Sequence, residues 1–126
     1  MPADYKIDTS KRMVFSIAYG NLTDEDVYSV LNRLRKDPDF DPGFSQLLDC
    51  TNVTHIDELS TEAIYALAEK NPFGIGSRRA FVAPQNPEYN TLRIYELLTT
   101  VHPDVVVVFK DMEEAYEFLN LESPPI

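Results

Sequence analysis

The most constraining stretch of this sequence is Gln46–Glu62, because it changes from strand-like to helix-like within a few residues. Two adjacent leucines predict a buried strand that ends at Asp49. Residues 50–57 are mostly polar and predict a loop, and a helix is expected to begin near Ser60. A strand that leads through a short polar connection into a helix is half of a βαβ unit, so this stretch favours an α/β fold.

The rest of the chain repeats this alternation of strands and helices. Strands are expected over the short apolar or alternating segments 4–8, 13–19, 44–49, 77–83 and 105–109. Helices are expected where a capping residue or an acidic first turn precedes an apolar stripe, near Thr23, Ser60, Asn86 and Asp111. The predicted order, β-β-α-β-α-β-α-β-α, implies an α/β fold with a mixed, mostly parallel five-stranded sheet and about four helices.

Length, net charge and cysteine content limit the number of domains, the type of partner and the cellular location that are expected. The 126 residues predict a single domain over residues 1–126, with a mobile tail at 121–126. A formal net charge of −10 argues against nucleic acid or an anionic membrane surface as a partner and suits a basic one. The longest apolar run, Val105–Phe109, is too short to span a bilayer, and the N-terminus is unlike a signal peptide. A cytoplasmic protein without membrane insertion is therefore expected, and the lone Cys50 excludes an internal disulfide.

The strand–loop–helix stretch also resembles a known family. Its residues match the D-x-[ST]-x-V-T-x-I-D run of STAS domains at Asp49, Thr51, Val53, Thr54, Ile56 and Asp57. STAS domains include the anti-sigma-factor antagonists of the SpoIIAA-like superfamily, and the element order agrees over roughly residues 4–120. The resemblance implies a SpoIIAA-like fold and a small, stand-alone, bacterial-type regulatory or protein-binding module without enzymatic activity.

The resemblance also implies a partner-binding loop and a departure within it. In the antagonists, a serine at the start of the helix is phosphorylated by a partner kinase, and Glu58 occupies the matching position here. A phosphoserine carries about −1.5 to −2 charge, and Glu58 supplies a permanent negative charge instead. We therefore expect a site locked in one charge state, unless Ser60 or Thr61 is modified; a role for Glu58 only in the helix start is the alternative. The candidate loop residues are Asp49, Thr51, His55, Asp57, Glu58 and Ser60.

A second reading of the fold leads to a different function. CRAL-TRIO domains share a related βα layout, so a small apolar-ligand or lipid carrier is the alternative function. That function needs an apolar pocket of a few hundred Å³. The partner's identity and the oligomeric state stay open. A homodimer is one alternative, because tyrosines flank the predicted apolar stripes at Tyr28, Tyr65, Tyr89 and Tyr116.

No recognised catalytic pattern is present, so we predict neither an enzyme nor a cofactor. Cys50 and His55 could form a thiolate–imidazole pair, but no third group orients them, and a packed cysteine is the favoured interpretation. The acids Asp49, Asp57 and Glu58 lack the glycine and the regular spacing of a calcium loop. Helix capping is the favoured role for these acids, and no metal site is predicted.

Residues 74–79 form a weak candidate for anion binding. The segment Gly74–Gly76 lacks a third glycine and precedes a strand rather than a helix. Arg78 and Arg79 follow it directly and could hold an anion, with pairing to nearby acids as the alternative.

Apolar stripes at helical or strand spacing predict the core. Leu31, Leu67 and Val107 are expected to be buried. Replacing each with alanine is then expected to cost about 2–4 kcal/mol, somewhat less for the valine.

Overall fold

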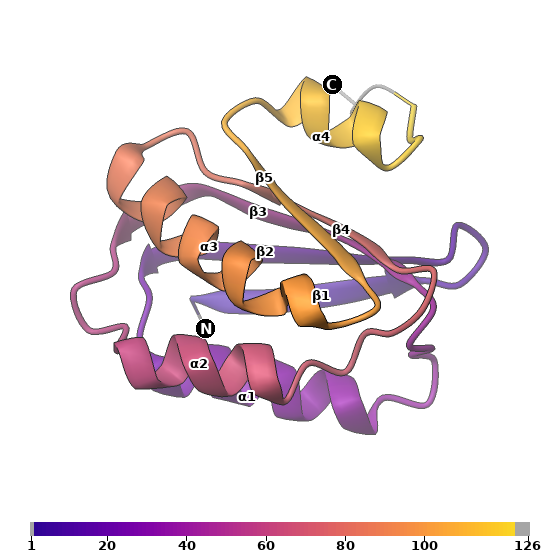
Figure 1. Cartoon of the computed structure of the whole chain (residues 1–126), viewed down its shortest axis with the longest axis horizontal. Coiled ribbons are helices and arrows are strands. Elements are labelled where there is room, and N and C mark those ends of the chain that lie inside the picture. The colour runs from indigo at the N-terminus through magenta and orange to yellow at the C-terminus, as the bar shows by residue number, and fades with distance from the viewer. Residues whose placement is uncertain (1, 123–126) are drawn as a thin grey trace.

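The computed structural model describes residues 2–122, and its elements follow the predicted order (Figure 1). The strands are β1 (Ala3–Asp8), β2 (Met13–Asn21), β3 (Ser45–His55), β4 (Arg78–Val82) and β5 (Val105–Phe109). The helices are α1 (Asp24–Lys36), α2 (Thr61–Glu69), α3 (Asn86–Leu98), the 3₁₀ turn η1 (Thr99–Val101) and α4 (Met112–Phe118). The predicted α/β fold, with a mixed five-stranded sheet and four α-helices, is confirmed.

The five strands lie in the sheet in the order of the sequence. β1 pairs antiparallel with β2, and the three following pairs are parallel. Right-handed connections between neighbouring parallel strands return on one side of the sheet, and α1, α2 and α3 cover that face. After β5 the chain crosses to the opposite face, where α4 packs (Figure 1). β4 is therefore covered on both faces, which explains its continuous apolar run.

Local capping chemistry sets where the helices begin. The side chain of Thr23 accepts from the backbone N–H of Asp26, and the Asp26 side chain accepts from the backbone N–H of Thr23, which forms a capping box. Ser60 and Asp111 cap α2 and α4 through their side chains, as predicted. α3 begins one residue earlier than predicted, because Gln85 rather than Asn86 is its N-cap residue, and Gln85 makes no side-chain capping bond.

The predicted loop at residues 50–57 is wrong for its first six residues, because β3 continues to His55. β2 also continues, to Asn21, and supplies a pairing partner for this extension. The register between these strands shifts after Ile17, as at a β-bulge. Cys50 and Val53 are consequently both buried although they are three residues apart. That spacing breaks the period of two by which strands are recognised in a sequence.

The start of the predicted tail has defined contacts. The backbone N–H of Leu121 donates to the carbonyl of Tyr116 at 2.9 Å, and the Leu121 side chain packs against the cluster under α4. Residues 123–126 of the predicted mobile tail lie outside the described residues.

The apolar residues that were predicted to form the core face the sheet or the helices as expected, but they are buried to different extents. Leu34 of α1 and Ile64 of α2 are buried, whereas Leu31, Leu67 and Val107 are only half-buried. We therefore expect the alanine variants of these last three residues to cost less than the 2–4 kcal/mol anticipated for core positions, because less apolar area is removed from contact.

Candidate functional site

Two loops meet at the carboxyl end of the parallel strands. The connection from β2 to α1 lies beside the connection from β3 to α2, because the backbone N–H of Leu22 donates to the carbonyl of His55 at 3.0 Å. The side-chain amide of Asn21 donates to Glu58 Oε2 at 3.4 Å. Carboxyl ends of parallel strands are where open α/β sheets place their binding loops.

A stronger pair of bonds joins the starts of α1 and α2. Both the backbone N–H and the hydroxyl of Ser60 donate to the carboxylate of Asp24, each at 2.7 Å. The same hydroxyl oxygen accepts from the backbone N–H of Ala63 at 3.0 Å. Asp24 is thus a site residue that the sequence interpretation treated only as a first-turn acid.

The structure separates the six predicted loop residues into two groups. Glu58 and Ser60 lie in the joined loops, with the exposed Asp57 beside them. Asp49 lies within β3, where its Oδ1 accepts from the backbone N–H of Thr51 at 2.9 Å and from the Thr51 hydroxyl at 2.6 Å.

His55 ends β3 next to the joined loops. Its side chain is exposed, and its Nδ1 lies 3.1 Å from the hydroxyl of Thr54.

Negative charge is concentrated where the two loops meet. Segments 13–32 and 37–69 contain no lysine or arginine. The exposed acids near the two joined helix starts form what we call the acidic edge: Glu25, Asp57, Glu58 and Glu62. Helix N-termini stabilise such carboxylates, so these four negative charges are compatible with a stable fold.

The two candidate anion-binding arginines are not brought together, because they alternate across β4. Arg78 is exposed on the α4 side, with its guanidinium carbon 4.3 Å from the ring centre of Phe118. Arg79 points to the opposite face and is only 5% exposed. Its Nη1 forms an ion pair with the buried Asp104 at 3.1 Å. A shared anion site at these two residues is therefore not supported by the geometry.

Arg79 instead anchors a buried polar network; its pairing with an acid is the alternative that the sequence offered, whereas its neutral partners were not predicted. Its Nε donates to Gln46 Oε1 at 2.9 Å, and Nη1 donates to Asn71, the Tyr95 hydroxyl and Asp104 at 2.9–3.1 Å. The side-chain amide of Gln46 in turn donates to the hydroxyl of Ser16, which extends the network to β2.

Three aromatic rings surround the same guanidinium. Its central carbon lies 4.3 Å from the ring centre of Phe73, 5.3 Å from that of Phe81 and 5.4 Å from that of Tyr95. Ion pairing and cation–π contacts together offset the cost of burying this charge.

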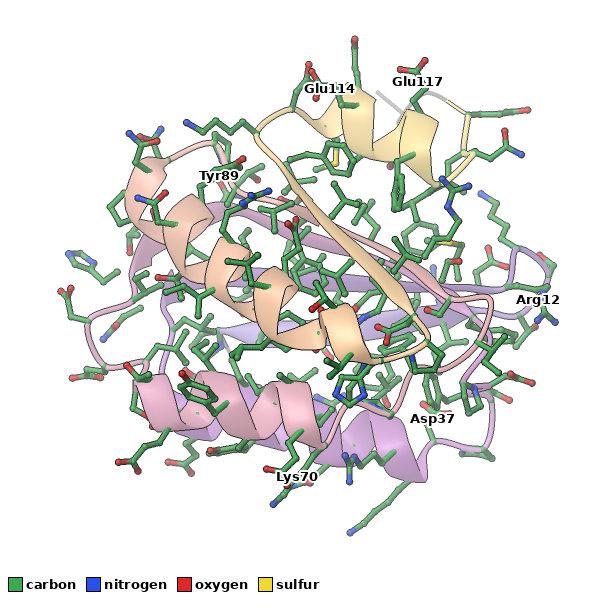
Figure 2. All side chains as sticks on the ribbon, in the orientation of Figure 1. Arg12, Asp37, Lys70, Tyr89, Glu114 and Glu117 are labelled. Carbon is green, nitrogen blue, oxygen red and sulfur yellow. The ribbon has the colours of Figure 1, made fainter. Side chains whose placement is uncertain are left out.

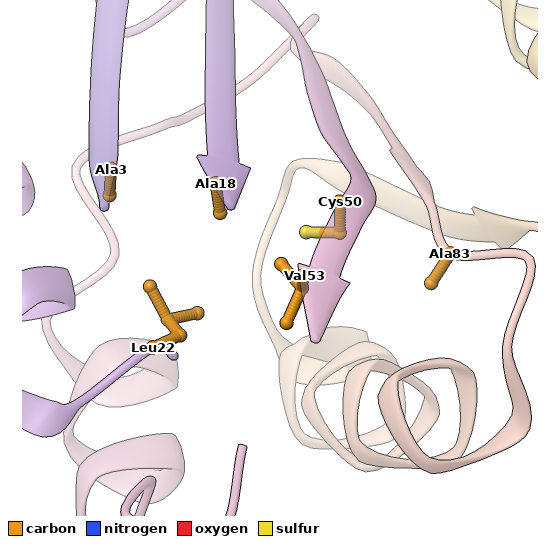
Figure 3. Close-up of a cluster of buried hydrophobic side chains, with 6 residues drawn as sticks. All are labelled: Ala3, Ala18, Leu22, Cys50, Val53 and Ala83. Atoms are coloured by element: carbon orange, nitrogen blue, oxygen red, sulfur yellow. The ribbon is translucent and has the colours of Figure 1, made fainter. Parts of the chain in front are cut away.

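A cavity of about 150 Å³ lies between this network and helices α1, α2 and α3. Its sheet side includes four small side chains, Ala3, Ser16, Ala18 and Cys50, beside larger ones such as Leu48 and Phe81. Figure 3 shows Ala3, Ala18 and Cys50 on three neighbouring strands, with Val53 further along the strand of Cys50 and Leu22 just past the end of β2. Small residues on the strands leave space beneath the helices, and the half-buried Leu31 and Leu67 line that space.

Cys50 is unsuited to nucleophilic chemistry. Burial, reinforced by the negative charges of Asp49 and Glu88, raises the pKa of its thiol to about 12. The thiol therefore keeps its proton at neutral pH, and the reactive thiolate is scarce. Within residues 2–122, no group of three or more His, Cys, Asp or Glu side chains is placed to hold a metal ion. The same part of the chain contains no helix whose length and apolar character would let it cross a membrane.

The chain is similar in fold to solved structures. No protein-family model matches the chain, and no curated protein matches it. One matching structure is an uncharacterised protein of the DUF3478 family from Shewanella loihica PV-4, described as having a SpoIIAA-like fold. It is 22% identical, covers 93% of this chain and 93% of its own, and superposes with a TM-score of 0.59. The chain has a SpoIIAA-like fold.

The fold that the resemblance to STAS domains implies is thereby confirmed. A likeness at 22% identity shows the fold alone. Within this SpoIIAA-like fold, the acidic edge lies at the carboxyl end of β2 and β3, and the cavity lies under the three-helix face.

Proposed function

We propose that this SpoIIAA-like chain is a non-enzymatic regulatory module whose acidic edge binds a basic surface of a protein partner. One observation carries the proposal: the Asp24–Ser60 bonds fix two acidic helix starts side by side, in segments that contain no basic residue. A fixed, single-sign surface on paired loops is suited to electrostatic recognition of a complementary partner.

The proposal is tested with three immobilised baits in lysate from the native cell. They are the wild type, the doubly substituted Asp57→Lys/Glu58→Lys chain, and the doubly substituted Glu114→Lys/Glu117→Lys chain as a control, which changes the net charge by the same amount. Glu114 and Glu117 are exposed on α4, on the opposite side of the sheet from α1 and α2 (Figure 2). We expect a protein retained by the wild type and the control but lost from the Asp57→Lys/Glu58→Lys chain, with retention falling as salt is raised. Identical retention on all three baits would disprove a role for the acidic edge.

The cavity favours a second candidate function, which is the binding of a small apolar ligand. Its volume of about 150 Å³ is below the 300–1,000 Å³ of typical drug-sized ligand sites. The alternative function from the sequence is a carrier of either a small apolar molecule or a lipid. A cavity of this size favours the small molecule over a long-chain lipid. Native mass spectrometry of the protein purified from its own cell tests this function, because a bound ligand adds mass and a chain of 14.4 kDa without adduct would count against it.

A further inference from the structure

The cavity beneath α1, α2 and α3 is mostly apolar, and its charged lining residues are the buried Arg79 and the exposed Asp4, which pairs with Arg33. A guanidinium group offers five N–H donors and no acceptor. Nε of Arg79 donates to Gln46, and Nη1 donates to Asn71, Tyr95 and Asp104. Within residues 2–122, Nη2 donates to no protein acceptor.

This second terminal nitrogen is not sealed in the core. In the described part of the chain, the fully buried side-chain atoms that lack a partner are Ser77 Oγ and Glu88 Oε2, and Nη2 of Arg79 is not among them. Arg79 lines the cavity although the whole residue is only 5% exposed. A buried cation with two unused donors beside an apolar cavity is the arrangement of a polar anchor in a ligand site.

The charge around Arg79 decides which kind of group suits that anchor. Asp104 already neutralises the guanidinium at 3.1 Å, and its own side chain is fully buried. An anionic ligand would leave one uncompensated negative charge in an apolar space, which is costly. A neutral oxygen acceptor satisfies the free donors without adding charge.

We propose that the cavity binds a small, largely apolar molecule that carries one neutral oxygen acceptor, and that this oxygen accepts a hydrogen bond from Nη2 of Arg79. The proposal deepens the second candidate function and rests on it. A cavity of about 150 Å³ has room for a single ring of roughly benzene size. The apolar lining, which includes Leu31, Leu67 and Leu92, would surround the ring.

Two probes of nearly equal shape separate the contribution of the Arg79 hydrogen bond to binding from that of the apolar cavity. Cyclohexanone carries a neutral carbonyl oxygen, and methylenecyclohexane replaces that oxygen with a CH₂ group. Both are titrated by NMR into the wild type and into Arg79→Lys, which keeps a positive charge for Asp104 but has no second terminal nitrogen. We expect the ratio of the two affinities, ketone over hydrocarbon, to fall by about tenfold or more in the variant. In the wild type, the Arg79 side-chain signals should shift with the ketone and stay nearly fixed with the hydrocarbon.

Further measurements make each failure recognisable. Ala18→Leu fills the cavity from the sheet side and should abolish binding of both probes, so unchanged binding would place the probes elsewhere and overturn the proposal. Hydrocarbon binding with an unchanged affinity ratio and unmoved Arg79 signals would disprove the anchor while leaving an apolar ligand site. Absence of binding by either probe would disprove the ligand site itself. Tighter binding of cyclohexanecarboxylate than of cyclohexanone would contradict the preference for a neutral acceptor.

Discussion

At the scale of single residues, the interaction on which stability should depend most strongly is the buried ion pair of Arg79 and Asp104. Their side chains are 7% and 0% exposed, so neither charge is screened by water. We expect Asp104→Ala to lower the free energy of unfolding by about 3–5 kcal/mol, because it leaves an unpaired buried cation. The exposed pair of Arg33 and Asp4 is the control, and Asp4→Ala should cost less than about 1 kcal/mol. Urea unfolding measures both, and equal costs would contradict this account.

The thiol of Cys50 predicts a pH dependence of stability. Its pKa is about 12 in the native chain, against an ordinary value of 9.0, so between these values the unfolded chain binds fewer protons. The stability that the protonated thiol contributes is therefore present below pH 9 and is lost as the pH rises toward 12. We expect Cys50→Ala to show a smaller loss of stability than the wild type between about pH 8 and 10.5. An equal loss in both proteins, measured by urea unfolding, would refute the assignment.

Tyr5 does not disturb that comparison. Burial, together with a hydrogen bond to Asp37, raises the pKa of its phenol to about 12. It acts in the same direction as Cys50, but it is present in both proteins and cancels in the difference.

At the scale of elements, the Asp24–Ser60 bonds predict that α1 and α2 depend on each other. Ser60→Ala removes the N-cap of α2, which costs about 1 kcal/mol, and it also removes one bond to Asp24. In a double-mutant cycle with Asp24→Ala, we expect a coupling energy of about 0.5–3 kcal/mol. Thr61→Ala, one residue along and exposed, is the matched control and should show no coupling to Asp24. Additive effects of Ser60→Ala and Asp24→Ala would show that the two helix starts are independent.

The same bonds bear on modification of the loop. A phosphate on Ser60 would lie against the Asp24 carboxylate, which accepts a hydrogen bond from the Ser60 hydroxyl at 2.7 Å. Thr61 is exposed and does not take part in the bonds to Asp24. Of the two modifications that the sequence left open, repulsion therefore disfavours the one at Ser60.

Elements defined by local chemistry could be predicted from the sequence, and contacts between distant segments could not. The cap at Thr23 depends on a residue three positions away, and β5 is a single apolar run. The Asp24–Ser60 bonds join residues 36 positions apart, and the ion pair of Arg79 and Asp104 spans 25. No local pattern encodes such pairs, so the bonds between Asp24 and Ser60 were missed, and the sequence left open whether Arg79 holds an anion or pairs with an acid. β3 was cut short because its register shift interrupts the alternation that marks a strand.

At the scale of the whole molecule, unbalanced negative charge predicts how stability responds to salt. The chain has 21 acidic and 11 basic residues, and residues 2–122 contain three ion pairs, of which one is buried. Net repulsion among surface carboxylates should therefore outweigh attraction, and salt screens it with a Debye length of about 8 Å at 0.15 M.

We accordingly expect the melting temperature to rise as sodium chloride increases from about 0.01 to 0.15 M, and to change little beyond that. Potassium chloride should act equally, because screening depends on ionic strength rather than on the identity of the cation. A rise in sodium chloride alone would indicate a specific cation site instead. A fall in melting temperature with either salt would show that attractive pairs dominate the surface, and it would remove the electrostatic basis for assigning a basic partner to the acidic edge.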